Sequence, residues 1–277
     1  MQNEDQIKAL LELINKEPAK VAALTEKLAQ LIKAQPQAAR RALAQVYGEK
    51  TPLFISDIIN NIHREELEKP FAWYFGKHNP ELLPGAVLIA RFINPGAESG
   101  AITAPFEDLK NKLAAQLDNA PDIQAKAEVF ESFIFGALRF KLENLTADAG
   151  LLSLPDIIKT RKTTVFAMAV LYTLLARALD MWADICDAGG KPVVRLRDSA
   201  TFEPVYVDIS ARGRHADEAE CYAQAASRGQ DWDGSAIEPM DNKQIIKRLL
   251  ANLIYVYSRG EGAAQTEVLR RITKSVF

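Results

Sequence analysis

The feature that most constrains the fold of this chain is an uninterrupted apolar run, VFAMAVLYTLLA, at residues 165–176. A helix that crosses a bilayer needs roughly 20 apolar residues, so this run is too short to span a membrane. A helix that is apolar on every side is stable in water only when other elements enclose it. We therefore expect a buried central helix over residues 163–179, inside a domain large enough to surround it.

Segments with strand character appear only after this helix. They are short, rich in β-branched residues and bounded by Gly, Asp or Pro. Their sequences are WADICDA, PVVRLRD and EPVYVDIS, at residues 182–188, 192–198 and 203–210. Helical patterns both precede and follow them. This order is typical of an α+β fold with a small antiparallel sheet.

The N-terminal part, residues 1–68, has apolar residues at helical spacing throughout. Pro18 and Pro36 stand where new helices could begin. Short helices joined by short turns resemble helical-repeat units, although no repeat period can be counted. The aromatic, turn-rich stretch FAWYFGKHNPELLPG at residues 71–85 follows, and we interpret it as a hinge.

Further helices are expected on both sides of the central helix. Their expected positions are a helix that stops at Asn94-Pro95, one at about 105–118, one from Pro121 to about Phe140 and a polar one at about 216–226. The loop RGQDWDGS then leads to two closing helices. The pattern predicts three regions: a helical extension (1–68), a core (80–240) and a terminal helix hairpin (241–277).

The charge balance and the cysteine count indicate which kinds of binding partner and which cellular compartment to expect. Lys and Arg number 34 against 36 Asp and Glu, so no overall basic field favours nucleic acid. Two cysteines, Cys186 and Cys221, are too few for a disulfide framework, which favours a reduced, cytoplasmic location. The acidic start MQNEDQIKALLELI lacks the basic region of a secretory leader. We therefore expect neither a nucleic-acid nor a membrane partner.

Three stretches, in this order, resemble the SirB-type branch of the transglutaminase-like superfamily. They are DIIKTRKTTVFAMAVLYTLLARALDMWADICDAGGKPVVRL, EPVYVDISARGRHADEAECYAQA and IEPMDNKQIIKRLLANLIYVYSRG. The ordered combination, rather than any single motif, carries the resemblance, which covers roughly residues 80–277. It implies a transglutaminase-like core, with the central helix packed on a small antiparallel sheet, followed by a tetratricopeptide-like helix hairpin.

The resemblance also implies where a catalytic site would lie. In the superfamily's enzymes a Cys at the start of the central helix attacks an acyl group, a His on the next strand takes its proton, and an Asp on the following strand orients that His. Those positions hold Val165, Lys191 and Asp208 in this chain. Valine carries no nucleophile, and a lysine acts as a base only if burial lowers its pKa strongly. The chain resembles a degenerate member that lacks the catalytic Cys and His, with no cofactor and no metal.

A divergent acyl transferase or hydrolase is the alternative. In it, Thr164 would replace the missing nucleophile and act with Lys191 and Asp208. The competing interpretation, which we favour, is that Thr163 or Thr164 simply caps the start of the helix, as threonine often does.

We interpret the remaining cysteines and histidines as packing residues rather than as catalytic or metal-binding ones. We expect Cys186 to be buried in a strand and Cys221 to occupy a half-buried helix position, although Cys221 could pair with His215. His63 and His78 lie far from it, without the spacing of metal ligands. The sequence AGGK, residues 188–191, is too short for a P-loop and predicts a tight turn between strands.

The function expected from these features is non-catalytic protein or peptide binding, or scaffolding. Helical repeats and helix hairpins commonly present concave surfaces to partners, and self-association is possible. The sequence does not specify the partner. If the resemblance holds, Val165, Lys191 and Asp208 should converge in space, and Lys191 could form an ion pair with Asp208.

Overall fold

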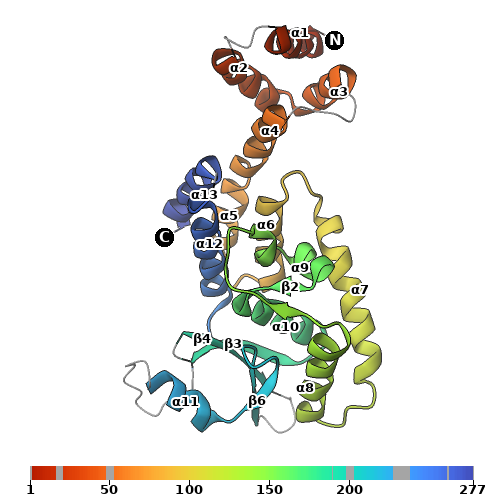
Figure 1. The fold of residues 1–277 in the computed structure, drawn as a ribbon, viewed down its shortest axis with the longest axis vertical. Coiled ribbons are helices and arrows are strands. Elements are labelled where there is room, and N and C mark those ends of the chain that lie inside the picture. Colours follow the sequence, from red (N-terminus) through yellow and green to blue (C-terminus); the bar gives the residue numbers. More distant parts are fainter. Residues whose placement is uncertain are drawn as a thin grey trace. The chain divides into compact units, whose positions relative to one another are not determined.

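The computed structural model describes residues 2–16, 21–47, 53–188, 190–197, 203–226, 238–260 and 262–276. The chain divides into two compact units, Met1–Glu68 and Lys69–Phe277, which we call the N-terminal unit and the main unit. Helices precede and follow a small sheet, so the expected α+β fold is confirmed (Figure 1).

The N-terminal unit consists of helices in the part that the structure describes. They are α1 (Gln2–Lys16), α2 (Val21–Ala34), α3 (Pro36–Tyr47) and α4 (Leu53–Glu65). Apolar residues at helical spacing form one core, in which Ile7, Leu11, Leu28 and Ile55 are fully buried. Pro36 begins α3, where its fixed φ angle and missing N–H cost nothing, whereas Pro18 lies outside the described residues.

The stretch that we interpreted as a hinge is largely helical, so that prediction is wrong. Helix α5 (Glu68–Gly76) includes Phe71, Tyr74 and Phe75, all three of which are buried. The Tyr74 hydroxyl lies 3.5 Å from the carbonyl oxygen of Asn242. Burial of three aromatic rings outweighs the turn signals that follow them in sequence, and α6 (Leu82–Ile93) begins only a few residues later.

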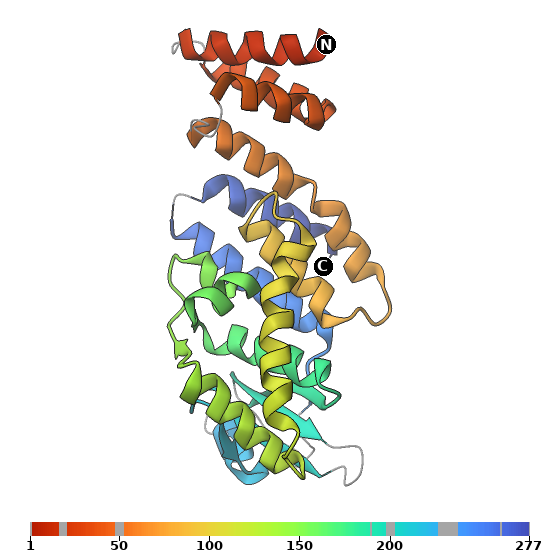
Figure 2. The ribbon, with the colours of Figure 1, turned by 90° about the vertical axis from the view of Figure 1, so that its right-hand side faces the viewer.

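The helices before the central one differ from expectation at their ends. Helix α7 (Ser99–Leu117) begins earlier than predicted and accommodates Pro105 (Figure 2, yellow). Helix α8 (Ile123–Glu131) passes into a π-helical segment, η2 (Ser132–Ala137), instead of continuing to Phe140. The chain then forms a short strand, β1 (Lys141–Leu142), which pairs in parallel with β2 (Lys162–Thr163). Neither strand was predicted.

The central helix is α10 (Val165–Ala178), and every residue from Phe166 to Ala176 is buried. It follows η3 (Ala149–Leu152) and α9 (Leu154–Thr160). The apolar run is therefore a core helix, as predicted. No helix within the described ranges is long and apolar enough to cross a membrane.

The main sheet has the order β3-β4-β5-β6 with antiparallel neighbours. Its strands are β3 (Trp182–Ala188), β4 (Lys191–Arg197), β5 (Pro204–Asp208) and β6 (Arg214–Ala216). The first three were predicted within two residues at each end, and β6 was missed. Helix α10 contacts β3 and β4, whereas α11 (Glu218–Ala226) lies on the other side of the sheet (Figure 1).

The chain closes with a helix hairpin, as expected, formed by α12 (Asn242–Ser258) and α13 (Ala263–Val276). Asp241 and Gln244 form a reciprocal capping box at the start of α12, which fixes where the helix begins. Helix α12 also packs on α6, so the hairpin belongs to the main unit. The loop RGQDWDGS lies outside the described residues.

Candidate functional site

The start of α10 is the position at which the resemblance places a nucleophile. Thr164 is the N-cap residue, and its Oγ1 accepts a hydrogen bond from the backbone N–H of Ala167 at 3.2 Å. Its neighbour Thr163 donates its hydroxyl to the carbonyl oxygen of Leu151 at 3.1 Å. Both hydroxyls are buried. These side chains therefore satisfy the backbone around the helix start, and Val165, the first helical residue, has no reactive group.

Lys191 and Asp208 share one face of the sheet. Lys191 opposes Ala188, and Asp208 opposes Val193. Directly opposed residues project to the same face of a sheet. Ala188 and Val193 belong to a buried cluster that includes Cys221 of α11.

The carboxylate of Asp208 also contributes to raising the pKa of the Cys221 thiol, after the larger effect of burial. Asp208 thus lies near α11. Lys191 and Asp208 stand on the face of α11, while Val165 belongs to the helix on the opposite face.

The Asp208 carboxylate stabilises the turn that follows β5. Its Oδ1 accepts hydrogen bonds from the Ser210 hydroxyl at 2.6 Å and from the Ala211 N–H at 3.1 Å. The Asp208 carbonyl accepts another from the Gly213 N–H at 2.9 Å. Among the residues that the structure describes, no ion pair joins Lys191 to Asp208. The pair that we considered is not formed, because the turn uses the carboxylate instead.

An arginine from α12 stands beside the start of α10. The Arg248 guanidinium lies 4.4 Å from the ring centroid of Phe166, in the first turn of that helix. It also forms an ion pair with Asp187 at 3.0 Å and donates to the carbonyl oxygen of Gly190 at 3.3 Å. Arg248 therefore links the helix start to the turn between β3 and β4. No sequence motif indicated this contact, because it joins residues about 60 positions apart.

The two cysteines are poor nucleophiles at neutral pH. Cys186 on β3 and Cys221 on α11 are both buried, and burial raises the pKa of each thiol to about 11. Thiolates are the reactive form, so both residues remain protonated and inert near pH 7. Cys221 proves fully buried rather than half-buried. His215 lies on β6, and within the described ranges no group of His, Cys, Asp and Glu is placed to hold a metal ion.

At the other end of the sheet, Asp184 gathers three arginines. Its carboxylate lies 3.5 Å from Arg177, 3.0 Å from Arg195 and 2.9 Å from Arg197. Arg177 also donates to the Ala183 carbonyl oxygen at 2.7 Å. This network links the end of α10 to three positions on β3 and β4, so it stabilises the packing of helix on sheet.

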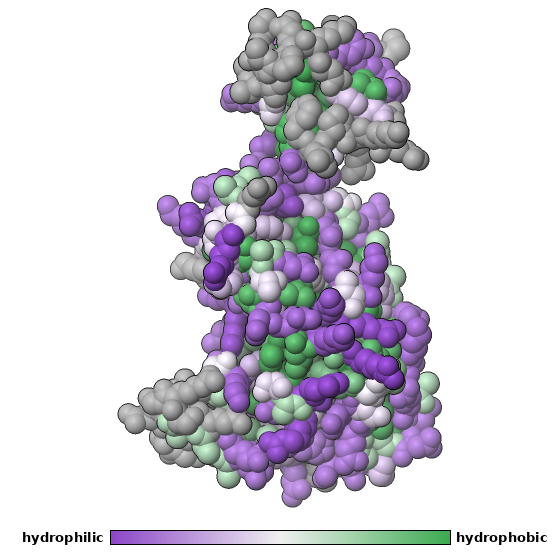
Figure 3. Space-filling view, in the orientation of Figure 1, coloured by the Kyte–Doolittle hydropathy of each residue, from purple (hydrophilic) through white to green (hydrophobic). Residues whose placement is uncertain are grey.

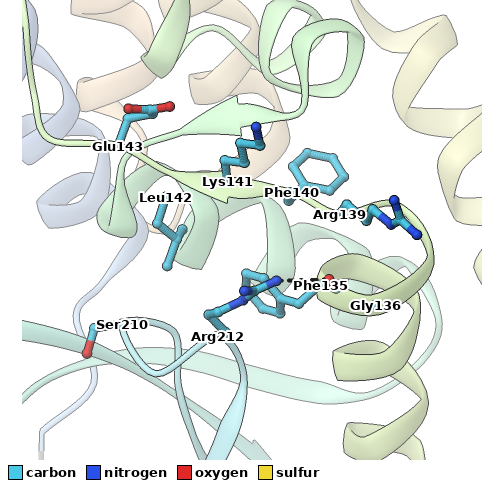
Figure 4. A pocket seen from close by; sticks show the side chains of 9 residues that line it. All are labelled: Phe135, Gly136, Arg139, Phe140, Lys141, Leu142, Glu143, Ser210 and Arg212. Carbon is cyan, nitrogen blue, oxygen red and sulfur yellow. Dashed lines mark hydrogen bonds between the residues drawn. The ribbon is translucent and has the colours of Figure 1, made fainter.

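A pocket of about 720 Å³ opens between the segment that follows η2 and the turn between β5 and β6. The residues that line it include Phe135, Arg139, Leu142, Glu143 and Arg212 (Figure 4). Arg212 donates to the Phe135 carbonyl oxygen at 3.2 Å across a gap of 77 residues in sequence. No sequence pattern indicated this pocket, because β1 and the π-helical segment that contribute to its lining were not predicted.

Comparison with known proteins places this architecture in a family. The sequence profile of the transglutaminase-like superfamily matches residues 101–251, more than half of the chain, from α7 through the sheet and into α12. The chain therefore belongs to the transglutaminase-like superfamily. No curated protein and no solved structure matches it.

Proposed function

We propose that this chain is a non-catalytic protein- or peptide-binding module, a degenerate SirB-type member of the superfamily that acts in the cytoplasm. The observation that carries the proposal is the start of α10. Val165 occupies the first helical position, Thr164 caps the helix, and Arg248 packs against Phe166. A helix start that has valine at its first position and a threonine hydroxyl engaged as the cap offers no nucleophile for acyl transfer.

The alternative acyl transferase or hydrolase requires Thr164, Lys191 and Asp208 to act together. Thr164 Oγ1 is buried and hydrogen-bonded, and Asp208 is engaged in its own turn. A general base must lie within hydrogen-bond reach of the nucleophile and be oriented by its partner. The contacts of Thr164 and Asp208 serve the local backbone and turn, so they count against catalysis by these two residues.

Exposed aromatic residues supply the surface that a binding module needs. Trp73 on α5 is 64% exposed, Trp182 on β3 is 52% exposed and Tyr255 on α12 is 41% exposed. On the face shown in Figure 3, apolar residues of the main unit (green) appear in small areas between hydrophilic ones (purple). Interfaces of this mixed kind rely on a few aromatic anchors. Lys77 lies over the Trp73 ring at 3.6 Å and holds it in place.

Site-specific photo-crosslinking tests the binding role. A photoreactive phenylalanine analogue at position 73, introduced into the intact chain in its native cytoplasm, should form a discrete protein adduct. The same analogue at Lys274, an exposed position on α13, serves as the matched control. An adduct with twice the mass of the chain would identify the partner as a second copy. Absence of any adduct from positions 73, 182 and 255 would contradict the binding role.

A thiol placed at the helix start tests the site assignment separately. Helix N-termini favour thiolates, because their unpaired N–H groups carry partial positive charge. Val165 is only half-buried, so Val165→Cys should react with a maleimide faster than the native thiols of Cys186 and Cys221. The labelled site is read by peptide mass mapping. Labelling no faster than that of the native thiols would mean that this helix start is closed and is not a former active-site cleft.

A further inference from the structure

The pocket beside β1 is built around arginines in an unusual backbone conformation. In the described part of the chain, four residues other than glycine have positive φ: Arg139 (55°), Arg161 (57°), Asp180 (59°) and Arg212 (60°). Two of the arginines line the pocket. The third, Arg161, donates to the Leu138 carbonyl oxygen next to it at 3.2 Å.

Arginine is a poor choice for such positions. The left-handed region is costly for residues with a Cβ atom, and glycine or asparagine adopts it far more readily. Strained residues of this kind cluster at functional sites, where the surrounding structure holds them. A π-helical segment, η2, ends at Ala137, two residues before Arg139, and such segments are also frequent at functional sites. Arginine at these positions therefore costs stability, and a functional role for the guanidinium groups would account for that cost.

The pocket carries excess positive charge. Figure 4 shows Leu142 and Arg212 facing one another, with Arg139 to one side of them. Both Lys141 and Glu143, the one acidic residue of the lining, point away from Arg212 (Figure 4), as alternation along this extended segment requires. The side chains of Arg139 and Lys141 form no ion pair with any residue in the described ranges. These cations are thus not neutralised by the protein, although the whole chain has a formal charge of −2.

Backbone geometry adds a donor to the same pocket. The N–H groups of Lys141 and Glu143 donate to the carbonyl oxygens of Arg161 and Thr163 on β2, each at 2.8 Å. Successive N–H groups along a strand point to opposite edges. The N–H of Leu142, a residue of the pocket lining, is therefore directed to the edge of β1 that faces away from β2.

From this arrangement we infer that the pocket binds a phosphate monoester, with the phosphoryl group between Arg139 and Arg212 and its organic part against Phe135, Phe140 and Leu142. A phosphate monoester carries a charge of about −1.5 to −2 at pH 7, which two guanidinium groups match. Planar guanidinium forks bind phosphoryl oxygens in bidentate geometry. The volume of about 720 Å³ accommodates a small organic ligand or a phosphorylated side chain. This inference does not depend on the absence of catalysis.

Calorimetric titration of the intact chain with phenyl phosphate tests the inference. Phenyl sulfate, which has a similar shape and a single charge, is the matched ligand. We expect saturable binding of phenyl phosphate, at least tenfold weaker binding of phenyl sulfate, and weaker binding of both at high salt. Binding of phenyl phosphate should also weaken below pH 6, because its second pKa is about 6. Equal affinity for the two ligands, or no saturable binding of phenyl phosphate, would overturn the inference.

Variants locate the site. Arg139→Gln combined with Arg212→Gln should weaken phenyl phosphate binding at least tenfold, whereas Arg270→Gln on α13, which removes an exposed charge elsewhere, should leave it unchanged. Arg212 also bonds to Phe135, so the double variant could disturb the fold. Arg139→Gly avoids this problem, because glycine suits the positive φ: its thermal midpoint should match or exceed that of the parent, while phosphate affinity falls. Unchanged affinity in Arg139→Gly would overturn the inference.

Two peptides distinguish the source of the phosphoryl group. A phosphorylated protein is the ligand if a phosphotyrosine peptide binds more tightly than phenyl phosphate and the unphosphorylated peptide does not bind. Tighter binding of phenyl phosphate than of the peptide identifies a free metabolite. Both results support the pocket. Equal binding of the phosphorylated and unphosphorylated peptides, unaffected by Arg139→Gly, would contradict it while leaving the binding role of the chain intact.

Discussion

The two faces of the four-stranded sheet have different characters. The face toward α10 presents Ala183, Ile185, Val194, Leu196 and Val207, and all five are buried and apolar. The face toward α11 mixes the buried cluster around Cys186 and Cys221 with charged residues, among them Asp184, Arg195 and Asp208.

The two faces therefore place different requirements on the segments that pack against them. Burial of an apolar face under any well-packed apolar helix stabilises the folded state, so α10 needs only a continuous apolar sequence. A face with buried charges tolerates only partners that satisfy each charge. The Asp208 carboxylate accepts a hydrogen bond from the turn after β5, and the Asp184 carboxylate forms ion pairs with three arginines. In this chain Asp208, one of the positions expected to support catalysis, has a structural role on the polar face.

The largest expected effect comes from the apolar face. Leu171 is 1% exposed in the middle of α10, so Leu171→Ala should lower the free energy of unfolding by about 2–5 kcal/mol through lost burial and the cavity left behind. Urea unfolding of the intact chain measures it, with Val165→Ala at the half-buried helix start as a control that costs less. A loss below about 0.5 kcal/mol for Leu171→Ala would show that α10 is not the core.

A smaller effect is expected from the polar face. Asp184→Asn keeps the side-chain shape but leaves Arg177, Arg195 and Arg197 close together without their carboxylate. The loss should be about 1–3 kcal/mol, less than for a fully buried network because these groups keep some contact with water. Asp108→Asn, which removes an exposed pair with Lys112, should cost under about 0.5 kcal/mol. Equal losses of unfolding free energy for the two variants would mean that the arginine network stabilises the fold no more than an exposed ion pair does.

The buried thiols predict how stability changes at high pH. Burial raises the pKa of Cys186 and Cys221 to about 11, above the ordinary value near 9. The unfolded chain therefore loses these protons first, so the stability that the protonated thiols contribute is complete below pH 9 and declines between about pH 9 and 11. The double variant Cys186→Ala with Cys221→Ala should lose less stability over this range. An identical decline in the parent and the double variant would assign it to other groups, such as the buried Tyr172, whose pKa is also raised.

The smallest effect concerns the strained arginines, which lie outside both faces. Arg139→Gly should raise the free energy of unfolding slightly, by up to about 1 kcal/mol, because glycine adopts positive φ without strain. Arg139→Ala retains the Cβ atom and should give no gain. A clear loss of stability in Arg139→Gly, measured by the same urea titration, would mean that the Arg139 side chain itself stabilises the fold.

The sequence predicted those elements whose signals are local and strong. The apolar run at 165–176, the β-branched strands and the capping residues each determine their own segment, so α10, β3, β4, β5 and α12 appear within a few residues of their expected positions. Helix α5 was misread because the burial of Phe71 and Tyr74 depends on distant neighbours. Strands β1 and β2 have two residues each, too few to show any periodicity.

The candidate site was predicted only in part, for a related reason. The residue types at positions 165, 191 and 208 could be read from the sequence. The sheet face on which Lys191 and Asp208 lie depends on the pairing register of β4 and β5, which the sequence does not specify. The contacts of Arg248 and Arg212 join segments about 60 and 77 residues apart, and a single sequence carries no record of such contacts.

The central claim, that the start of α10 performs no acyl transfer, is tested most directly by intact-mass analysis after incubation with an activated acyl ester. The intact chain at pH 7 should gain no acyl group at Thr164, and Thr164→Val should behave identically except for lower stability, because it loses the helix cap. Hydroxylamine should release nothing from either protein. A stoichiometric adduct that maps to Thr164, is absent from Thr164→Val and is released by hydroxylamine would contradict the account and identify an enzyme.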